Sequence, residues 1–271
     1  MFTRGTRRCG AAIASLAVLG LSPQLAWAQQ SDAELAKQLS NPVASLVSVP
    51  LQLNYDCCFG PDDGGRTTLN VQPVMPFSMN DDWNLVVRTI MPVIHQERTS
   101  PLNGSETGIG DITQSFFFSP KASPNGVTWA VGPAFLWPTA KGALGTERWA
   151  AGPTALVLKQ TGGWTYGMLA NHLWSYADHG GPQRSDVSAT FLQPFVSWTS
   201  ENHTTIGVNT ESTYDWTAEE WTVPINLTVA HLYSFGGQKV QLTGGVKVYA
   251  VSPDDELDWG ARVVATFLFP K

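Results

Sequence analysis

Charged side chains of both signs occur at alternate positions in segments that are otherwise largely apolar. Opposite charges that share a narrow protein interior must be paired or hydrated, because an isolated charge away from water is costly. Such a set predicts either an ion-pair lattice that seals the interior or a polar pore that passes small solutes. The members are three basic and four acidic residues: Arg88, Lys247, Arg262, Asp56, Asp111, Glu211 and Asp215.

Uncharged polar residues extend this set at the same alternating positions. Amide side chains both donate and accept hydrogen bonds, so they suit a wet interior. We expect them to line that interior together with the charged residues. They are Asn70, Gln72, Asn171, Gln193, Asn209 and Asn226.

Catalytic patterns are weak. The G-x-S-x-G elbow of hydrolases is missing, and the run Gly104–Gly108 has its serine in the wrong place. His172 and Ser175 form a pair that a membrane lipase would use, but no third member stands at a suggestive position. The acidic run 254–256 is read as a solvated loop rather than a cation site. We therefore predict no enzyme, no cofactor and no metal.

Cys57 and Cys58 are adjacent. An exported protein meets an oxidising compartment. A vicinal disulfide is strained, however, so the sequence favours two small unpaired residues over a bond between them.

The first 28 residues have the form of a secretory signal peptide. Arg4, Arg7 and Arg8 precede an apolar core at 11–21 that is too short to span a bilayer, and Ala26-Trp27-Ala28 fits a cleavage site. Cleavage near Ala28 removes three positive charges and no acid, which takes the formal net charge from −6 to −9. An acidic mature chain argues against nucleic acid as a partner.

Residues 29–42 form either a short helix or an unstructured leader. Ser31 and Glu34 have the spacing of a capping box, and Asn41-Pro42 ends the pattern. A helix this short is marginal in water by itself, which keeps the leader as an alternative.

From residue 43 to 271 the hydrophobic period is two, as in β-strands. In Leu257–Phe269, for example, Trp259, Val263 and Phe269 share one side and Arg262 the other. About eleven further segments repeat the pattern. Long connections, near Cys57–Gly65, Glu97–Thr107, Ala140–Glu147 and Asp178–Arg184, alternate with short turns.

Tryptophans stand at the ends of these segments, where indole rings prefer the membrane interface. Together the patterns predict an all-β fold: a closed antiparallel up-and-down transmembrane β-barrel of about twelve strands, with a short N-terminal helix. Eight prolines within the expected strands fit this poorly, because proline has no backbone N–H to donate to the neighbouring strand. They are placed at bulges or strand ends.

Several motifs resemble those of a known family. They include NPVASLVSVPLQLNYD, VGPAFLWPTA, TFLQPFVSW and EEWTVPINL, and the likeness extends over residues 41–271. The chain resembles bacterial outer-membrane transporters grouped with the MetA-pathway of phenol degradation proteins, which many genomes label neuromedin U. This resemblance implies an outer-membrane barrel with a transport role, and phenol-type aromatic solutes by the family's label. It transfers no binding residue.

The sequence therefore predicts a channel or transporter for small solutes, with hydrophobic or aromatic compounds among the candidates, in the outer membrane of a Gram-negative bacterium. The alternative is a sealed structural or surface-binding barrel that does not conduct. Expected partners are outer-membrane lipid and the barrel-assembly machinery. Phe269 is followed by Pro270 and Lys271, whereas many outer-membrane barrels end on the aromatic residue itself.

Overall fold

A computed structural model describes residues 31–59, 63–100, 103–179, 185–253 and 257–269. All of them belong to one compact unit that begins at Ser31. The predicted signal peptide and the acidic run 254–256 lie outside the described residues.

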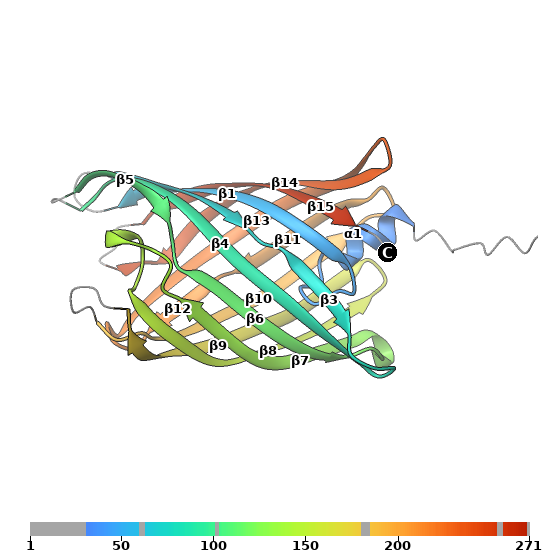
Figure 1. The fold of residues 1–271 in the computed structure, drawn as a ribbon. Helices are drawn as coiled ribbons and strands as arrows, with labels where there is room; N and C mark the ends of the chain where they lie inside the picture. The colour runs from blue at the N-terminus through green and yellow to red at the C-terminus, as the bar shows by residue number, and fades with distance from the viewer. Residues whose placement is uncertain (1–30, 60–62, 101–102, 180–184, 254–256, 270–271) are drawn as a thin grey trace, which may run out of the picture. The chain divides into compact units, whose positions relative to one another are not determined.

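A single antiparallel sheet makes up most of this unit (Figure 1). Two 3-10 helices, η1 (Pro124–Gly126) and η2 (Gly142–Leu144), lie in its connections. The strand segments, in chain order, are β1 (Val47–Phe59), β2 (Gly64–Val71), β3 (Val74–Ser78), β4 (Trp83–Ser100), β5 (Asn103–Ile109), β6 (Ile112–Pro120), β7 (Val127–Trp137), β8 (Arg148–Thr161), β9 (Trp164–Asp178), β10 (Ser188–Thr199), β11 (Thr204–Thr210), β12 (Ser212–Asp215), β13 (Glu220–Phe235), β14 (Gln238–Val251) and β15 (Trp259–Phe269).

These segments form twelve spans, because three spans are interrupted once each. β2 and β3 pair with the same neighbour, β4, on either side of Gln72-Pro73. Gly110-Asp111 separates β5 from β6, and Glu211 separates β11 from β12. The sheet closes because β1 pairs with β15 as well as β2, so the predicted closed transmembrane β-barrel is confirmed.

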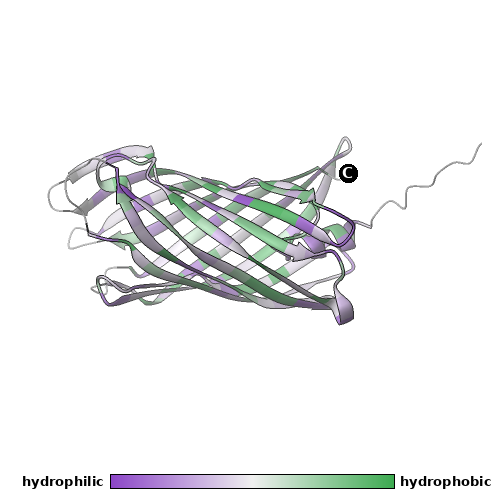
Figure 2. Cartoon of the chain, turned by 60° about the horizontal axis from the view of Figure 1, so that its bottom comes forward, coloured by the Kyte–Doolittle hydropathy of each residue, from purple (hydrophilic) through white to green (hydrophobic). Residues whose placement is uncertain are grey.

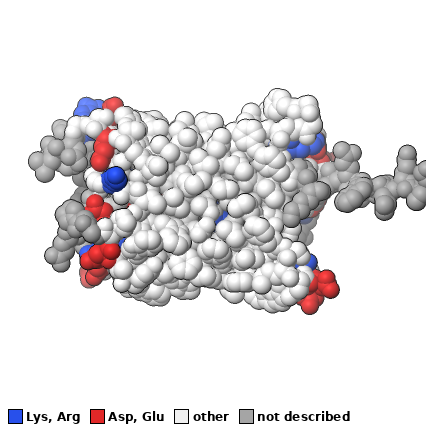
Figure 3. All heavy atoms as spheres, in the orientation of Figure 1, with Lys and Arg blue, Asp and Glu red and all other residues white. Residues whose placement is uncertain are grey.

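Side chains alternate between the outside and the interior as the period of two predicts. In β15, Trp259 and Val263 are 48% and 61% exposed, whereas Arg262 between them is 7% exposed. Hydrophobic and hydrophilic residues alternate along the strands in Figure 2. Charged side chains gather at the two ends, and the belt between them is nearly free of charge on the face seen in Figure 3.

Tryptophans ring both ends of the uncharged belt. One end carries the short turns at 79–82, 121–126, 162–163, 200–203 and 236–237, and we call it the turn end; the opposite end is the loop end. Trp164 and Trp198 face each other at the turn end. At the loop end, Trp216 and Trp221 both pack against Tyr214. Exposed rings at strand ends are the placement that an interfacial girdle requires.

Helix α1 (Asp32–Gln38) precedes the barrel, so the helical alternative for this segment is the one observed. Ser31 caps it, its hydroxyl accepting a hydrogen bond from the Glu34 backbone N–H, as the capping pattern predicted. None of the helices in the described part of the chain has the length and apolar character needed to cross a membrane.

Two predictions about connections were wrong. The expected loop at Glu97–Thr107 is mostly strand: β4 continues to Ser100 and β5 begins at Asn103. The sequence predicts a loop here because the segment is polar. A hairpin that extends beyond the bilayer, however, has no apolar face to bury and can be polar throughout. Likewise Cys57, Phe59 and Gly65 lie in strands rather than in a loop.

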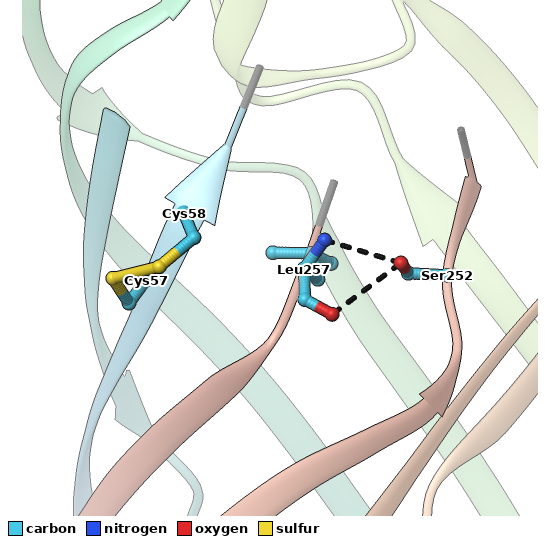
Figure 4. Close-up of a disulfide and its surroundings, with 4 residues drawn as sticks. All are labelled: Cys57, Cys58, Ser252 and Leu257. Atoms are coloured by element: carbon cyan, nitrogen blue, oxygen red, sulfur yellow. Dashed lines mark hydrogen bonds between the residues drawn. A yellow bond between two sulfur atoms is a disulfide. The ribbon is translucent and has the colours of Figure 1, made fainter. Parts of the chain in front are cut away.

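Cys57 and Cys58 are joined by a disulfide, which corrects the preference for unpaired thiols (Figure 4). The pair lies at a β-bulge, where the register between β1 and β2 shifts between Cys57 and Phe59. Cys58 has a positive φ of 77°. The bulge frees this residue from the regular extended conformation, so the backbone accommodates a bond between sequence neighbours.

Prolines coincide with irregularities at several points. Pro73 lies in the gap between β2 and β3, and Pro224 lies at the register shift between β13 and β14. Pro133 faces Pro153 directly across β7 and β8, so two missing donors fall together. Because these prolines fall at irregularities or opposite each other, fewer positions of the sheet lose a hydrogen bond between strands.

Candidate functional site: the lumen

Inside the barrel, toward the loop end, ion pairs join β15 and β14 to other parts of the wall. Arg262 on β15 donates from both terminal nitrogens to the two carboxylate oxygens of Glu211, at 2.8 and 2.7 Å. Its Nε donates to Oδ1 of Asn54 at 2.7 Å. The break between β11 and β12 occurs at Glu211 itself. A bidentate pair with a third hydrogen bond satisfies a buried guanidinium well.

The second pair joins β14 to β1. Lys247 Nζ lies 2.6 Å from Oδ1 of Asp56, and the Tyr249 hydroxyl donates to the same oxygen at 2.8 Å. Lys247 and Asp56 are only 6% and 8% exposed. Both pairs link strands that are far apart in sequence, so they fasten the part of the wall where the sheet closes.

Amide residues extend this polar network along the inner wall of the barrel. Asn226 donates to Asn209 at 2.9 Å. Arg88 donates to Oε1 of Gln72 at 3.1 Å, and Gln72 lies in the gap between β2 and β3. The polar residues predicted from sequence are thus brought together chiefly on the wall formed by β11–β15 and β1–β4.

Four predicted residues take other positions. Asn171 and Gln193 line interior cavities. Asn70 is half-buried on β2. Asp215 ends β12 with an exposed side chain that accepts hydrogen bonds from the backbone N–H groups of Thr217 and Ala218, so it stabilises a turn at the loop end and does not join the ion pairs.

The opposite wall is mainly apolar, although Ser115, Thr128 and Thr154 are also buried on it. Buried side chains from β4 to β9 pack together in the interior, with Phe191 and Phe195 of β10 against them. The cluster comprises Val86, Phe117, Ala130, Leu156, Leu158 and Leu169 from these strands, together with Val43, which precedes β1. The lumen is therefore amphipathic, with one charged and hydrogen-bonding side and one hydrocarbon side.

Space remains between the two walls. A cavity of about 260 Å³ lies among Arg88, Ile90, Phe117 and Phe191. A second, of about 180 Å³, lies between Arg88 and the N-terminal segment, and a third, of about 230 Å³, reaches from Gln193 to Asn209. The interior is thus partly hollow and not filled as a protein core is.

Residues 31–46, the N-terminal segment, lie across the lumen at the turn end. Leu35, Ala36 and Leu46 pack with Leu232 and Leu268 of the wall. Figure 1 shows α1 beside the end of β15. Polar contacts reach other strands: Gln160 on β8 donates to the Lys37 carbonyl, and Asn84 on β4 donates to Ser45. The segment thus contacts opposite sides of the barrel and narrows this end.

An ion pair also holds α1 to the wall. Lys239 Nζ lies 2.6 Å from Oδ1 of Asp32. The hydrogen bond from Lys239 lowers the pKa of the Asp32 carboxyl below its ordinary value of 3.8, and the charges of Lys239 and His203 add to this effect. A lowered folded pKa means that the pair stabilises docking above the ordinary value and that this stability is lost as the pH falls through the folded pKa.

We therefore expect acid to loosen the N-terminal segment. At neutral pH the pair contributes at most about 1 kcal/mol, because both groups are partly exposed. Below about pH 3.8 protease cleavage within residues 31–46 should accelerate in wild type, measured with an acid-active protease. In a Lys239→Gln variant the acceleration over the same pH range should be smaller. Equal acceleration in both proteins would contradict this role for the ion pair.

Asp111 shapes the loop end. Its carboxylate accepts hydrogen bonds from the backbone N–H of Ala140 at 3.0 Å and from the Thr146 hydroxyl at 2.8 Å. These bonds fold the connection between β7 and β8 toward the interior, where Leu144 is buried. Asp111 thus acts on the loop that narrows the mouth.

The candidate catalytic pair is not assembled. His172 and Ser175 are three positions apart on β9 and so point to opposite faces. His172 Nδ1 lies 2.7 Å from the Thr190 hydroxyl, and Ser175 accepts a hydrogen bond from the Val187 backbone. Among the described residues there is no cluster of three or more potential metal ligands.

Three interior residues are missing from the set predicted from the sequence. Asn54 stands on the same strand face as Asp56, so alternation alone would have found it. Tyr249 resembles an interfacial aromatic, but it lies two positions after Lys247 and so shares its inward face, where it donates a hydrogen bond to Asp56. Arg66, next to the expected loop at Cys57–Gly65, lies over the Phe59 ring with 4.5 Å from its guanidinium carbon to the ring centroid.

Comparison with solved structures supports the fold. A COG4313 outer membrane channel from Pseudomonas putida F1 superimposes with a TM-score of 0.67 at 12% sequence identity, covering 83% of this chain and 96% of that one. Identity this low relates the folds alone.

Two other outer-membrane proteins are less similar. The β domain of the Bordetella autotransporter BrkA gives a TM-score of 0.47 at 10% identity and covers 83% of this chain and all of its own length. An outer membrane phospholipase dimer from Salmonella typhi gives 0.46 at 8% identity, covering 89% and 99%. No protein-family model and no curated protein sequence matches this chain.

Proposed function

We propose that this protein is an outer-membrane channel for small solutes in a Gram-negative bacterium, with the turn end in the periplasm. The observation that carries the proposal is the partly hollow, amphipathic lumen. A barrel with a purely structural role has no need of cavities of about 180–260 Å³ between its walls. Short periplasmic turns and longer outer loops are the usual arrangement of such barrels.

The two narrowings define how solutes would pass. Residues 31–46 partly close the turn end, and the connection held by Asp111 narrows the loop end. A solute on this route meets the ion pairs on one side and hydrocarbon on the other. Compounds that have both an apolar body and a polar group fit this interior better than sugars or inorganic ions do. The sealed-barrel alternative remains the competing function.

Single-channel recording in planar bilayers tests the proposal. Wild type should give small conductance steps. Glu211→Ala removes one side of an ion pair on the polar wall of the lumen and should enlarge them, while Arg88→Ala should shift ion selectivity toward cations. Uptake of small solutes into liposomes provides a second measurement.

The sealed barrel makes the opposite prediction. If wild type and Glu211→Ala both insert as folded barrels but neither conducts ions nor admits any solute to liposomes, the channel proposal is wrong and the structural role stands.

A further inference from the structure

Arg88 is a lumen cation without an anionic partner. Among the described residues, no carboxylate lies within ion-pair distance of it, and its hydrogen bond goes to the neutral amide of Gln72. Glu211 attracts Arg88 electrostatically, but both of its carboxylate oxygens accept hydrogen bonds from Arg262. A guanidinium has five N–H donors in a fixed planar arrangement, so most of its capacity is unused here.

The other central acid is also occupied. Asp56 binds Lys247 and Tyr249. Glu211 and Asp56 are thus each paired with a cation other than Arg88, which leaves Arg88 without a carboxylate partner among the described residues. An uncompensated charge in a confined interior is unfavourable, which makes the site attractive to an anion.

Arg88 lines both central cavities. It lies at one end of the cavity of about 260 Å³, whose other walls include the apolar side chains of Ile90, Phe117, Leu173 and Phe191. It also borders the cavity of about 180 Å³ next to the N-terminal segment. Its position places a positive charge between a mainly apolar cavity and a more polar one.

The size of the larger cavity limits the ligand. A dry apolar cavity of about 150 Å³ is enough to hold a benzene ring. The space beside Arg88 therefore admits a body of one ring with a substituent. Inorganic anions would satisfy the charge but leave the apolar wall uncovered. A neutral ring compound would cover the wall but leave the charge unpaired.

We propose that Arg88 and the adjacent apolar cavity form a binding site for small organic carboxylates with a single-ring apolar body. The carboxylate accepts hydrogen bonds from the free N–H groups of Arg88, and the ring packs against Phe117 and Phe191. Planar pairing of a guanidinium with a carboxylate gives both strength and orientation. This inference rests on the proposed channel function, because it names the class of solute for that lumen.

Calorimetric titration of the detergent-solubilised protein tests the site with three probes. Benzoate has both ring and charge, benzamide has the ring without the charge, and acetate has the charge without the ring. Wild type should bind benzoate at least about tenfold more tightly than benzamide, since a hydrogen bond to a charged group contributes about 1.5–3 kcal/mol. It should also bind benzoate at least about tenfold more tightly than acetate, since acetate has no ring to bury against Phe117 and Phe191. Equal affinity for benzoate and benzamide would overturn the proposal.

Variants separate this site from general effects of charge. Arg88→Gln should abolish the preference for benzoate over benzamide, and Arg88→Lys should retain part of it. Leu173→Trp fills the cavity and should weaken benzoate binding while leaving Arg88 in place. Lys121→Gln removes an exposed cation at a turn and should change nothing. Persistence of the preference in folded Arg88→Gln would also overturn the proposal.

The outcomes distinguish this inference from the channel function. If benzoate is preferred but no variant conducts, the binding site stands and the channel function fails. If the protein conducts but shows no preference for benzoate, the channel function stands and the site fails. Current block by benzoate in planar bilayers, lost in Arg88→Gln, would support both.

Discussion

A double variant, Leu35→Asp with Leu46→Asp, is expected to conduct severalfold more current than wild type. Both leucines are buried against Leu232 and Leu268, at 3% and 5% exposed. Burying a leucine side chain is worth about 1.5–3 kcal/mol, and a charge placed in the same position adds a further penalty. The N-terminal segment should then leave the turn end, and single-channel recording measures the gain.

The matched control adds the same two charges at the same end of the barrel. Met79 is exposed in a turn and Thr161 is exposed at the end of β8, so Met79→Asp with Thr161→Asp should leave conductance unchanged. Barrel assembly is checked in both proteins by the change in gel mobility on heating. A double variant at Leu35 and Leu46 that folds but conducts like wild type would show that this segment does not restrict the lumen.

Glu211→Leu is expected to destabilise the barrel by about 3–5 kcal/mol, because it leaves the Arg262 guanidinium buried without its anion. Arg262 is only 7% exposed, and Asn54 alone cannot compensate its charge. Urea unfolding in lipid vesicles, followed by tryptophan fluorescence, measures the loss.

A double-mutant cycle shows whether the effect belongs to the pair. Glu211→Leu with Arg262→Leu removes both charges and should recover most of the lost stability, since replacing a buried pair by apolar residues is often neutral. Asp215→Asn, at an exposed turn, serves as the control and should cost less than about 1 kcal/mol. If the double variant is as unstable as Glu211→Leu, the ion pair does not explain the loss.

Both experiments depend on an interior that the sequence only partly revealed. Alternation identified which residues of Leu257–Phe269 face inward, because the side-chain period of a strand is fixed by backbone geometry. It therefore also placed Arg262 and Lys247 on the inner face. It could not identify their partners: Arg262 contacts Glu211 from a span that is not its neighbour, and that contact depends on how the closed sheet curves.

The strand interruptions also could not be predicted from residues that are near one another in the sequence. Gln72, Asp111 and Glu211 all fall at breaks in a span, and in each case the side chain binds a group that the regular ladder does not supply. A break in a strand depends on the pairing of its two neighbours, and only prolines such as Pro73 signal it in the sequence.

The sequence by itself determined the class of fold, the strand faces, the aromatic girdles and the helix cap at Ser31, because each depends on residues that are near one another in the chain. Tertiary structure alone decided the disulfide at the Cys57 bulge, the docking of residues 31–46 across the lumen and the lack of a carboxylate partner for Arg88 among the described residues. The disulfide depends on the bulge in the pairing of β1 with β2. The other two features depend on which side chains meet inside a closed barrel, and closure pairs residues as far apart as Val47 and Phe269, which are 222 positions apart.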